Sequence, residues 1–321
     1  MISSQDVVQA YRLFLGREPE SSEVVQRLQQ ECANLEELRM RFLSSSELRS
    51  SFSRFTAEPS GSKPLNWPPI SVETKTSADQ LDTLIRHVEG NWKILGENEP
   101  HWSVLSDDKF LSKNIASTEE NFYDSGKHVI DLLTATAGRN SIELSEFKRC
   151  FELGCGLGRL TLWLSRQFQH VDAMDVSPSH LKLAADAMAS YERENVSFLK
   201  LSNLTDLDAI EDFDIFVSII VLQHNPPPII AALLERILSK LNPGGIAYFQ
   251  LSTYHVGYKF KLDQYVKSIK DEGRIEMHVL PHQELFKIIY AANCQVLEIR
   301  EDTWTGQAEG ISNTLLVRKD S

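Results

Sequence analysis

The sequence is poor in cysteine and lacks long apolar stretches, and each shortage excludes a class of protein. Its four cysteines, Cys32, Cys150, Cys155 and Cys294, form no C-x-x-C pair. This argues against a zinc site or a disulfide framework and favours reduced thiols in the cytoplasm. No stretch approaches the roughly 20 apolar residues of a membrane span, and the N-terminus lacks the pattern of a secretory signal. We therefore expect a cytoplasmic protein without a metal site.

Basic residues are also scarce relative to acidic ones. The chain has 33 lysines and arginines against 45 aspartates and glutamates, a formal net charge of −12. Proteins that bind nucleic acids usually present a basic face to the phosphates, and no run of lysine and arginine provides one here. A length of 321 residues with 42% hydrophobic and 24% charged residues indicates a globular protein with one large and one smaller domain.

The first half of the chain is patterned for helices. Apolar residues at helical spacing predict a small helical bundle over 1–56, and prolines with a glycine predict a linker over 57–78. A helical lid or cap region is expected over 79–147. Within it, the aromatic segment 92–105 is expected to be irregular and to pack against the next domain.

From residue 148 to 321 short apolar strands alternate with helices. Strands are predicted at 149–153, 170–175, 196–200, 213–220, 245–251, 294–300 and 311–317. Helices are predicted near 157–168, 178–192 and 227–241. This order implies right-handed crossovers and a parallel sheet, whereas the last two strands have no helix between them and predict an edge hairpin. The fold class is therefore α/β: a doubly wound, mostly parallel seven-stranded sheet with an antiparallel edge hairpin, beside a small all-α N-terminal domain.

A glycine-rich loop joins the first strand of this region to its first helix. Residues 152–158 read Glu-Leu-Gly-Cys-Gly-Leu-Gly. Glycines allow positive φ and a close approach of a ligand to the backbone, and the following helix start offers unpaired N–H groups. A dinucleotide fingerprint needs G-x-G-x-x-G. Here Arg159 stands where its last glycine belongs, which argues against a nicotinamide oxidoreductase. A plain tight turn remains the alternative.

An acidic residue follows at the end of the second strand. In doubly wound folds, an acid about 20 positions after the glycine loop accepts hydrogen bonds from ribose hydroxyls, and Asp175 has this spacing. The alternative is local, because Asp175 or Ser177 could cap the helix that begins at Pro178.

Taken together, the loop E-x-G-x-G-x-G, Asp175 and the segments 198–203 and 213–225 resemble the class I S-adenosylmethionine-dependent methyltransferases over 149–251. The resemblance implies S-adenosyl-L-methionine as cofactor, with Glu152 on its ammonium group and Asp175 on its ribose. Ser202 stands where many members carry an aspartate for the adenine, so Ser202 or Asn203 would make that contact, unless they form only a turn. The expected cofactor-binding residues are Glu152, Gly154, Cys155, Gly156, Gly158, Asp175, Val176, Ser202, Asn203 and Tyr123.

Catalytic and acceptor residues are expected after the fourth and fifth strands. His224 follows the fourth strand and its ring suits proton transfer near neutral pH, although it could merely stabilise its loop. Tyr254, His255 and Tyr258 could bind a sugar or an aromatic ring, and His255 is a second candidate for catalysis. The alternative is an aromatic cluster that seals the domain edge. Tyr123, in a possible lid over 121–126, would reach the cofactor unless it packs in the core.

The N-terminal segments 11–19 and 42–48 resemble a short helical domain that accompanies bacterial glycan-building enzymes. This resemblance implies a sugar or a lipid-linked glycan as the acceptor. The alternative is a generic helical bundle that aids docking or self-association. The leading hypothesis is methyl transfer to a small molecule or glycan, at oxygen. The competing hypotheses are a non-catalytic cofactor-binding scaffold and a nicotinamide oxidoreductase.

Overall fold

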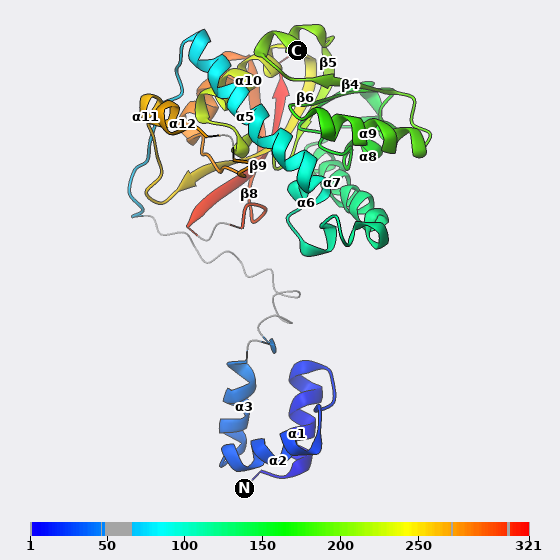
Figure 1. The fold of residues 1–321 in the computed structure, drawn as a ribbon, viewed down its shortest axis with the longest axis vertical. Coiled ribbons are helices and arrows are strands. Elements are labelled where there is room, and N and C mark those ends of the chain that lie inside the picture. The colour runs from blue at the N-terminus through cyan, green and yellow to red at the C-terminus, as the bar shows by residue number, and fades with distance from the viewer. Residues whose placement is uncertain (1, 46, 49–65, 271, 307–308, 321) are drawn as a thin grey trace. The chain divides into compact units, whose positions relative to one another are not determined.

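The structure is a computed structural model that describes residues 2–45, 47–48, 66–270, 272–306 and 309–320. The chain divides into two compact units, Met1–Trp67 and Pro68–Ser321 (Figure 1). Residues 57–65 of the predicted linker, and residues 46 and 49–56 of the predicted helical bundle, lie outside the described residues.

The smaller unit is helical, as predicted. Its helices are α1 (Ser4–Ala10), a π-helical turn (Tyr11–Leu15), α2 (Ser22–Glu31) and α3 (Leu35–Leu43). Ser3 and Asp6 form a capping box at the start of α1, which satisfies backbone N–H groups that the helix itself leaves unpaired. Tyr11 packs edge-on against Phe42 at 5.0 Å between ring centroids, so side chains of α3 and of the π-helical turn share one small core.

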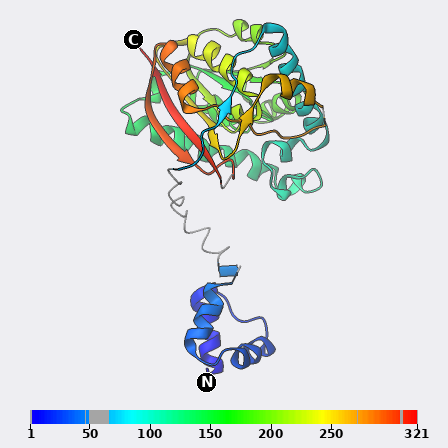
Figure 2. The ribbon, with the colours of Figure 1, turned by 90° about the vertical axis from the view of Figure 1, so that its left-hand side faces the viewer.

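The larger unit is built on a seven-stranded sheet in the order β4-β3-β2-β5-β6-β9-β8, which confirms the predicted fold class. All neighbours up to β6 pair in parallel, whereas β9 pairs antiparallel with β6 and with β8. Figure 2 shows the β8–β9 hairpin as red strands at one edge. The strands are β2 (Arg149–Leu153), β3 (His170–Asp175), β4 (Val196–Lys200), β5 (Phe213–Ser218), β6 (Leu241–His255), β8 (Cys294–Asp302) and β9 (Gly310–Lys319).

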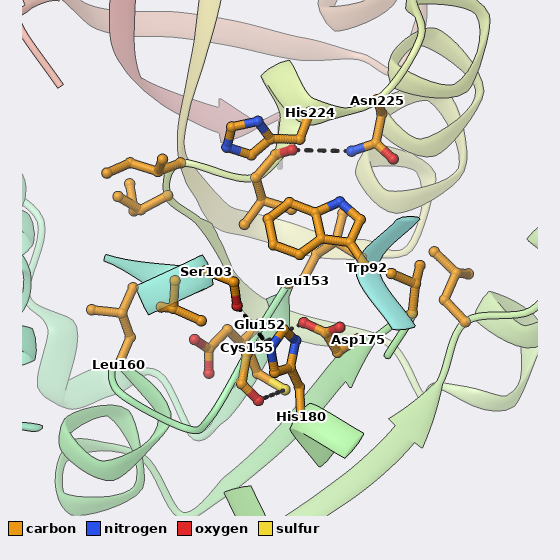
Figure 3. A pocket seen from close by; sticks show the side chains of 18 of the residues that line it. Trp92, Ser103, Glu152, Leu153, Cys155, Leu160, Asp175, His180, His224 and Asn225 are labelled. Atoms are coloured by element: carbon orange, nitrogen blue, oxygen red, sulfur yellow. Dashed lines mark hydrogen bonds between the residues drawn. The ribbon is translucent and has the colours of Figure 1, made fainter. Parts of the chain in front are cut away.

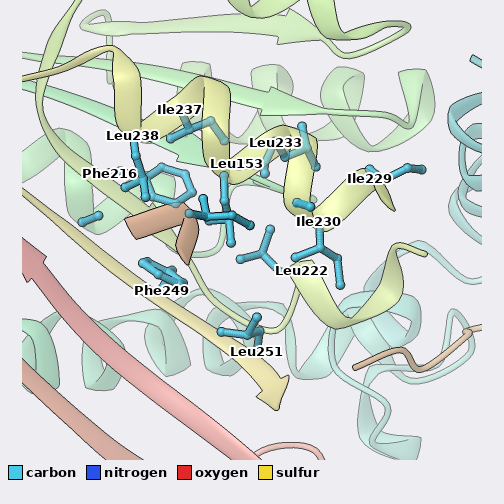
Figure 4. Close-up of a cluster of buried hydrophobic side chains, with 14 of the residues drawn as sticks. Leu153, Phe216, Leu222, Ile229, Ile230, Leu233, Ile237, Leu238, Phe249 and Leu251 are labelled. Carbon is cyan, nitrogen blue, oxygen red and sulfur yellow. The ribbon is translucent and has the colours of Figure 1, made fainter. Parts of the chain in front are cut away.

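Helices cover both faces of this sheet. One face packs against α5 (Ala78–Asn98), α10 (Pro227–Ser239) and α12 (His282–Ala291), and Figure 4 shows α10 side chains against Leu153, Phe216 and Phe249. The other face packs against α7 (Glu119–Arg139) and α8 (Thr161–Gln167). The remaining helices are α6 (Pro100–Val104), α9 (Pro178–Ser190), α11 (Leu262–Ser268) and short 3-10 turns at Asp108–Phe110, Ile115–Ser117, Leu144–Glu146, Leu204–Ala209 and Leu222–His224.

Two features differ from the sequence prediction. The segment 92–105, expected to be irregular, is the end of α5 followed by α6, and Pro100 begins the second helix. Proline tolerates the first turn of a helix because no backbone N–H is needed there. A further pair of short strands, β1 (Ser71–Val72) and β7 (Lys259–Phe260), joins the segment after Trp67 to the chain beyond β6. No helix among the described residues is long and apolar enough to cross a membrane.

Helix α7 lies unusually close to the chain that follows the glycine loop, and this contact predicts a stability effect. A Cβ added at Gly126 would lie 2.1 Å from the carbonyl oxygen of Arg159, whereas one at Gly138 would meet nothing within 4 Å. We expect Gly126→Ala to lower the free energy of unfolding by about 1–3 kcal/mol through overpacking. Gly138→Ala, in the same helix, is expected to raise it by about 0.5–1 kcal/mol. Urea unfolding followed by tryptophan fluorescence measures both, and equal effects would contradict the predicted contact.

Candidate functional site

A cleft lies at the carboxyl ends of the parallel strands β2, β3 and β5. The empty space in it amounts to about 850 Å³, open mouth included. Its floor includes Glu152, Asp175 and the glycine loop, and its opposite wall comes from Trp92 of α5 and Ser103 of α6 (Figure 3). Ligands of open parallel sheets bind in this position because the strand order reverses there.

The glycine loop can be made only of glycines at its turning points. Gly154 and Gly156 have φ values of +74° and +53°, a backbone conformation that residues other than glycine rarely adopt. A Cβ at Gly154 would lie 2.3 Å from Val221, and one at Gly156 would lie 2.8 Å from Val104. The loop therefore keeps its backbone exposed to the cleft while the neighbouring side chains stay close.

Asp175 joins the loop to the start of α9. Its carboxylate accepts hydrogen bonds from the N–H of Gly156 at 2.8 Å and from the N–H of Ser177 at 2.9 Å. The Ser177 hydroxyl caps α9 by accepting from the N–H of His180. A carboxylate can accept roughly four hydrogen bonds, so the capping interpretation and a ligand contact by Asp175 are compatible.

Glu152 is a buried acid with one hydrogen-bond donor. It is 1% exposed and accepts a hydrogen bond from the Thr161 hydroxyl at 2.6 Å. Burial raises the pKa of Glu152 to about 7, although Thr161 and the charge of Arg159 act in the opposite direction. A carboxyl in this state is ready to ionise when a cation enters the cleft.

His224 faces the cleft beside the indole of Trp92. The two rings lie 5.5 Å apart between centroids, and Trp92 also lies 6.2 Å from His180 (Figure 3). The Nδ1 of His224 is 2.8 Å from the carbonyl oxygen of Glu276. Because a carbonyl only accepts, Nδ1 must carry the hydrogen and Nε2 is then unprotonated. Burial lowers the pKa of His224 to about 4, so the ring is neutral near pH 7.

The structure brings together seven of the residues expected from sequence. Those that line the cleft are Glu152, Gly154, Cys155, Gly156, Asp175, Val176 and His224. Gly158 lies outside it, where a Cβ would be 3.1 Å from Met188. Ser202 and Asn203 also lie outside: their backbone N–H groups bind Asp206, and Leu201 is the residue of this turn that lines the cleft.

The remaining expected residues lie apart from the cleft lining. Tyr123 is buried in α7, and its hydroxyl donates to the carbonyl oxygen of Leu157 at 3.2 Å. Tyr254 donates to the carbonyl oxygen of Pro68, and the Nδ1 of His255 is 3.0 Å from the carbonyl oxygen of Val256. The Tyr258 hydroxyl is 2.8 Å from Nδ1 of His278. The ligand roles assigned to these four residues stay predictions.

Glu276 is the centre of a polar cluster behind His224. Its carboxylate contacts His87 at 3.1 Å, His278 at 2.9 Å and the hydroxyl of Tyr265. Burial alone would raise the pKa of Glu276, but hydrogen bonds from His278, Tyr265 and His87 lower it to about 2. The cluster fixes the chain around residue 276, and with it the carbonyl that holds His224.

Among the cleft residues that were not expected from the sequence are Trp92, Ser103, Arg159 and His180. His180 lies in the first turn of α9, and Arg159 lies directly after the glycine loop and just before α8. This closeness to the motif residues was the available signal. Trp92 and Ser103 belong to the segment expected to be irregular, so no sequence signal placed them over the cleft. Among the described residues, no group of His, Cys, Asp or Glu side chains is arranged to hold a metal ion.

Comparison with known proteins identifies the class of domain. Residues 151–247 match the sequence model of the methyltransferase domain. The chain is similar to the carboxy-S-adenosyl-L-methionine synthases of Trichlorobacter lovleyi, with 33% identity over 101 residues, and of Shewanella amazonensis, with 33% identity over 100 residues. Each alignment covers 30% of this chain and 41% of the relative, so the chain spans about two fifths of the length of the curated relatives it matches.

A solved structure supports the fold. The magnesium protoporphyrin IX methyltransferase of Synechocystis PCC 6803 with bound SAH superposes with a TM-score of 0.50 and 15% identity, covering 73% of this chain and 98% of that one. The fold predicted from the sequence is thus confirmed. The prediction of an enzyme, and of S-adenosylmethionine as its cofactor, agrees with the methyltransferase domain at residues 151–247.

Proposed function

We propose that this chain is an S-adenosylmethionine-dependent methyltransferase that acts on a small-molecule acceptor. The observation that carries the proposal is that Glu152 and Asp175, from two neighbouring strands, line one cleft with the glycine loop between them. The domain match over 151–247 supports the same conclusion. The cytoplasm remains the expected location.

The residues of the cleft fit this cofactor. Its methionine end carries an ammonium group, which matches the buried carboxyl of Glu152, and its ribose hydroxyls match the remaining acceptor positions of Asp175. Val176 and Leu201 offer apolar surface for the adenine. The positive φ of Gly154 and Gly156 leaves room for the cofactor to approach the backbone.

The bound cofactor supplies an electrophilic methyl group on a cationic sulfonium. The chain's part is to hold the acceptor in line with this methyl group, because the rate of such a reaction depends largely on the orientation of the acceptor. The indole of Trp92 gives an electron-rich face for a cation. Neutral His224 does not repel positive charge, and its Nε2 is the group that would take a proton from an acceptor hydroxyl.

For the acceptor, we favour a sugar or glycan methylated at oxygen. The support is the resemblance of the N-terminal unit to domains beside glycan-building enzymes, together with the polar rings of Tyr254 and His255 at the end of β6 and of Tyr258 just after it. Docking or self-association through the N-terminal unit is part of the same proposal. The alternative is a cofactor-binding scaffold without turnover. It predicts cofactor binding but no labelled product.

The test has two steps. Isothermal titration with S-adenosylmethionine, NAD and NADP should show binding of the first alone. Incubation of cell extract with cofactor labelled in its methyl group, followed by mass spectrometry, should then reveal a labelled small molecule. Binding of NAD or NADP without S-adenosylmethionine would contradict the proposal, and cofactor binding without any labelled product would favour the scaffold.

Asp175→Ala is expected to weaken binding of S-adenosylmethionine by about 1–3 kcal/mol, the range for a lost hydrogen bond to a charged group. The variant also frees the N–H of Gly156, which loosens the loop. Asp186→Ala, an exposed acid on α9, is the matched control and should leave the affinity unchanged. Titration calorimetry measures both, and an unchanged affinity of the Asp175 variant would remove this residue from the site.

A further inference from the structure

Arg159 is a buried cation that lacks a salt bridge among the described residues. Its side chain lines the cleft and the residue is 7% exposed. One guanidinium nitrogen donates to the Ser125 hydroxyl at 3.3 Å, and Nε has no hydrogen-bond partner in the part of the chain that the structure describes. Burying a guanidinium without an anion is costly, and that cost shows in the pKa of Arg159, which burial lowers to about 10.

An equally incomplete acid lies on the same cleft. Glu152 is buried, and within the described ranges the hydroxyl of Thr161 is its one hydrogen-bond donor. No salt bridge joins Glu152 to Arg159 within the described part of the chain, although each affects the charge state of the other. Two opposite buried charges that are not paired with each other form the complement of a zwitterion.

We propose that Arg159 binds the α-carboxylate at the methionine end of the cofactor, while Glu152 binds the ammonium group. This inference rests on the proposed function and deepens it. The chemistry favours arginine because a planar guanidinium can bind a carboxylate through two parallel hydrogen bonds. Ser125, from α7, holds one nitrogen of the fork and leaves Nε without a partner until a carboxylate arrives.

The proposal makes Arg159 a specificity residue. It would distinguish S-adenosylmethionine from decarboxylated S-adenosylmethionine, which keeps the sulfonium and the amine but lacks the carboxylate. A residue that only shapes the loop would affect both ligands alike. The comparison of these two ligands therefore separates recognition of the carboxylate from a structural role.

Isothermal titration of the full chain with each ligand is the test. The wild-type protein should bind S-adenosylmethionine roughly 10- to 100-fold more tightly than the decarboxylated form, the range for hydrogen bonds to a charged group. In Arg159→Met this preference should disappear through loss of affinity for S-adenosylmethionine alone. Arg166→Met removes an exposed arginine of α8 that lies over Trp163, and it should keep the full preference.

Several outcomes would overturn the proposal. Equal affinity of the wild-type protein for both ligands would overturn it, and no variant is needed to see this. An equal loss of both affinities in Arg159→Met would overturn it as well. If Arg159→Met fails to fold, Arg159→Lys tests the same point, because a point charge should keep only part of the preference. Binding of neither ligand by the wild-type protein would instead reject the proposed function itself.

Discussion

Replacing Glu152 by glutamine is expected to stabilise the cofactor-free protein at pH 8 and to weaken its affinity for S-adenosylmethionine. Burial raises the pKa of Glu152 from 4.5 to about 7. Its contribution to stability is therefore fully present below pH 4.5 and is lost as the pH rises through 7. Glutamine does not ionise, so the variant should lack this loss, and its advantage should grow by about 2 kcal/mol between pH 5 and pH 8.

The same substitution removes the negative charge that the ammonium group needs. Loss of a hydrogen bond to a charged group predicts a roughly 10- to 100-fold weaker affinity for the cofactor. Urea unfolding at pH 5 and pH 8 measures stability, and titration calorimetry measures binding. Glu143→Gln, an exposed acid before β2, is the control for both. A stability difference that stays constant with pH would show that Glu152 does not titrate in this range.

Binding of S-adenosylmethionine should itself depend on pH. Below pH 7 the carboxyl of Glu152 is largely protonated in the free protein, and it must release its proton to meet the ammonium group. The affinity should therefore fall by roughly tenfold for each pH unit below 7, since one proton is released per cofactor bound. The ligand's own amine stays charged there, because α-amino groups titrate near about 8.

Calorimetry in two buffers of different ionisation enthalpy checks this result. At pH 5.5 the apparent binding enthalpy should differ between buffers by about the amount for one released proton. Two other groups on the cleft lining carry charge near Glu152, namely Arg159 and Asp175. The Glu152→Gln variant shows whether the proton comes from Glu152 or from one of these two groups, since the substitution should abolish the buffer dependence if Glu152 is the source. A dependence that survives in this variant would assign the proton to another group.

The sheet was predictable from sequence because its strands are short apolar runs bounded by turns. The predicted strand 170–175 agrees with β3 at both ends. The helices of segment 92–105 were not predictable, because its tryptophans and proline obscure the helical pattern. Packing against the sheet domain stabilises these helices instead. The β1–β7 pair was missed for a related reason. Two-residue strands have no periodicity, and their pairing is a tertiary contact.

The site was predictable where a backbone requirement fixes the residue type. Gly154 and Gly156 have positive φ, and the carboxylate of Asp175 binds the loop backbone. The residue types at these positions therefore reveal them in the sequence. The opposite wall was not predictable. Trp92 and Ser103 reach the cleft only through the packing of α5 and α6 over the strand ends, and neither residue type is diagnostic by itself.

The short parallel pairing of β1 with β7 has a mechanical consequence for the chain. Glu73 also binds Lys261 and the N–H of Leu262, so residues 71–73 are held against residues 259–262, the segment that follows β6. Since Tyr254 of β6 also binds the carbonyl oxygen of Pro68, residues 68–73 are held both by the end of β6 and by the segment that follows it. Removal of the N-terminal residues through Val72 would leave the segment after β6 without its β1 partner. Removal that stops before Pro68 would keep this pairing intact.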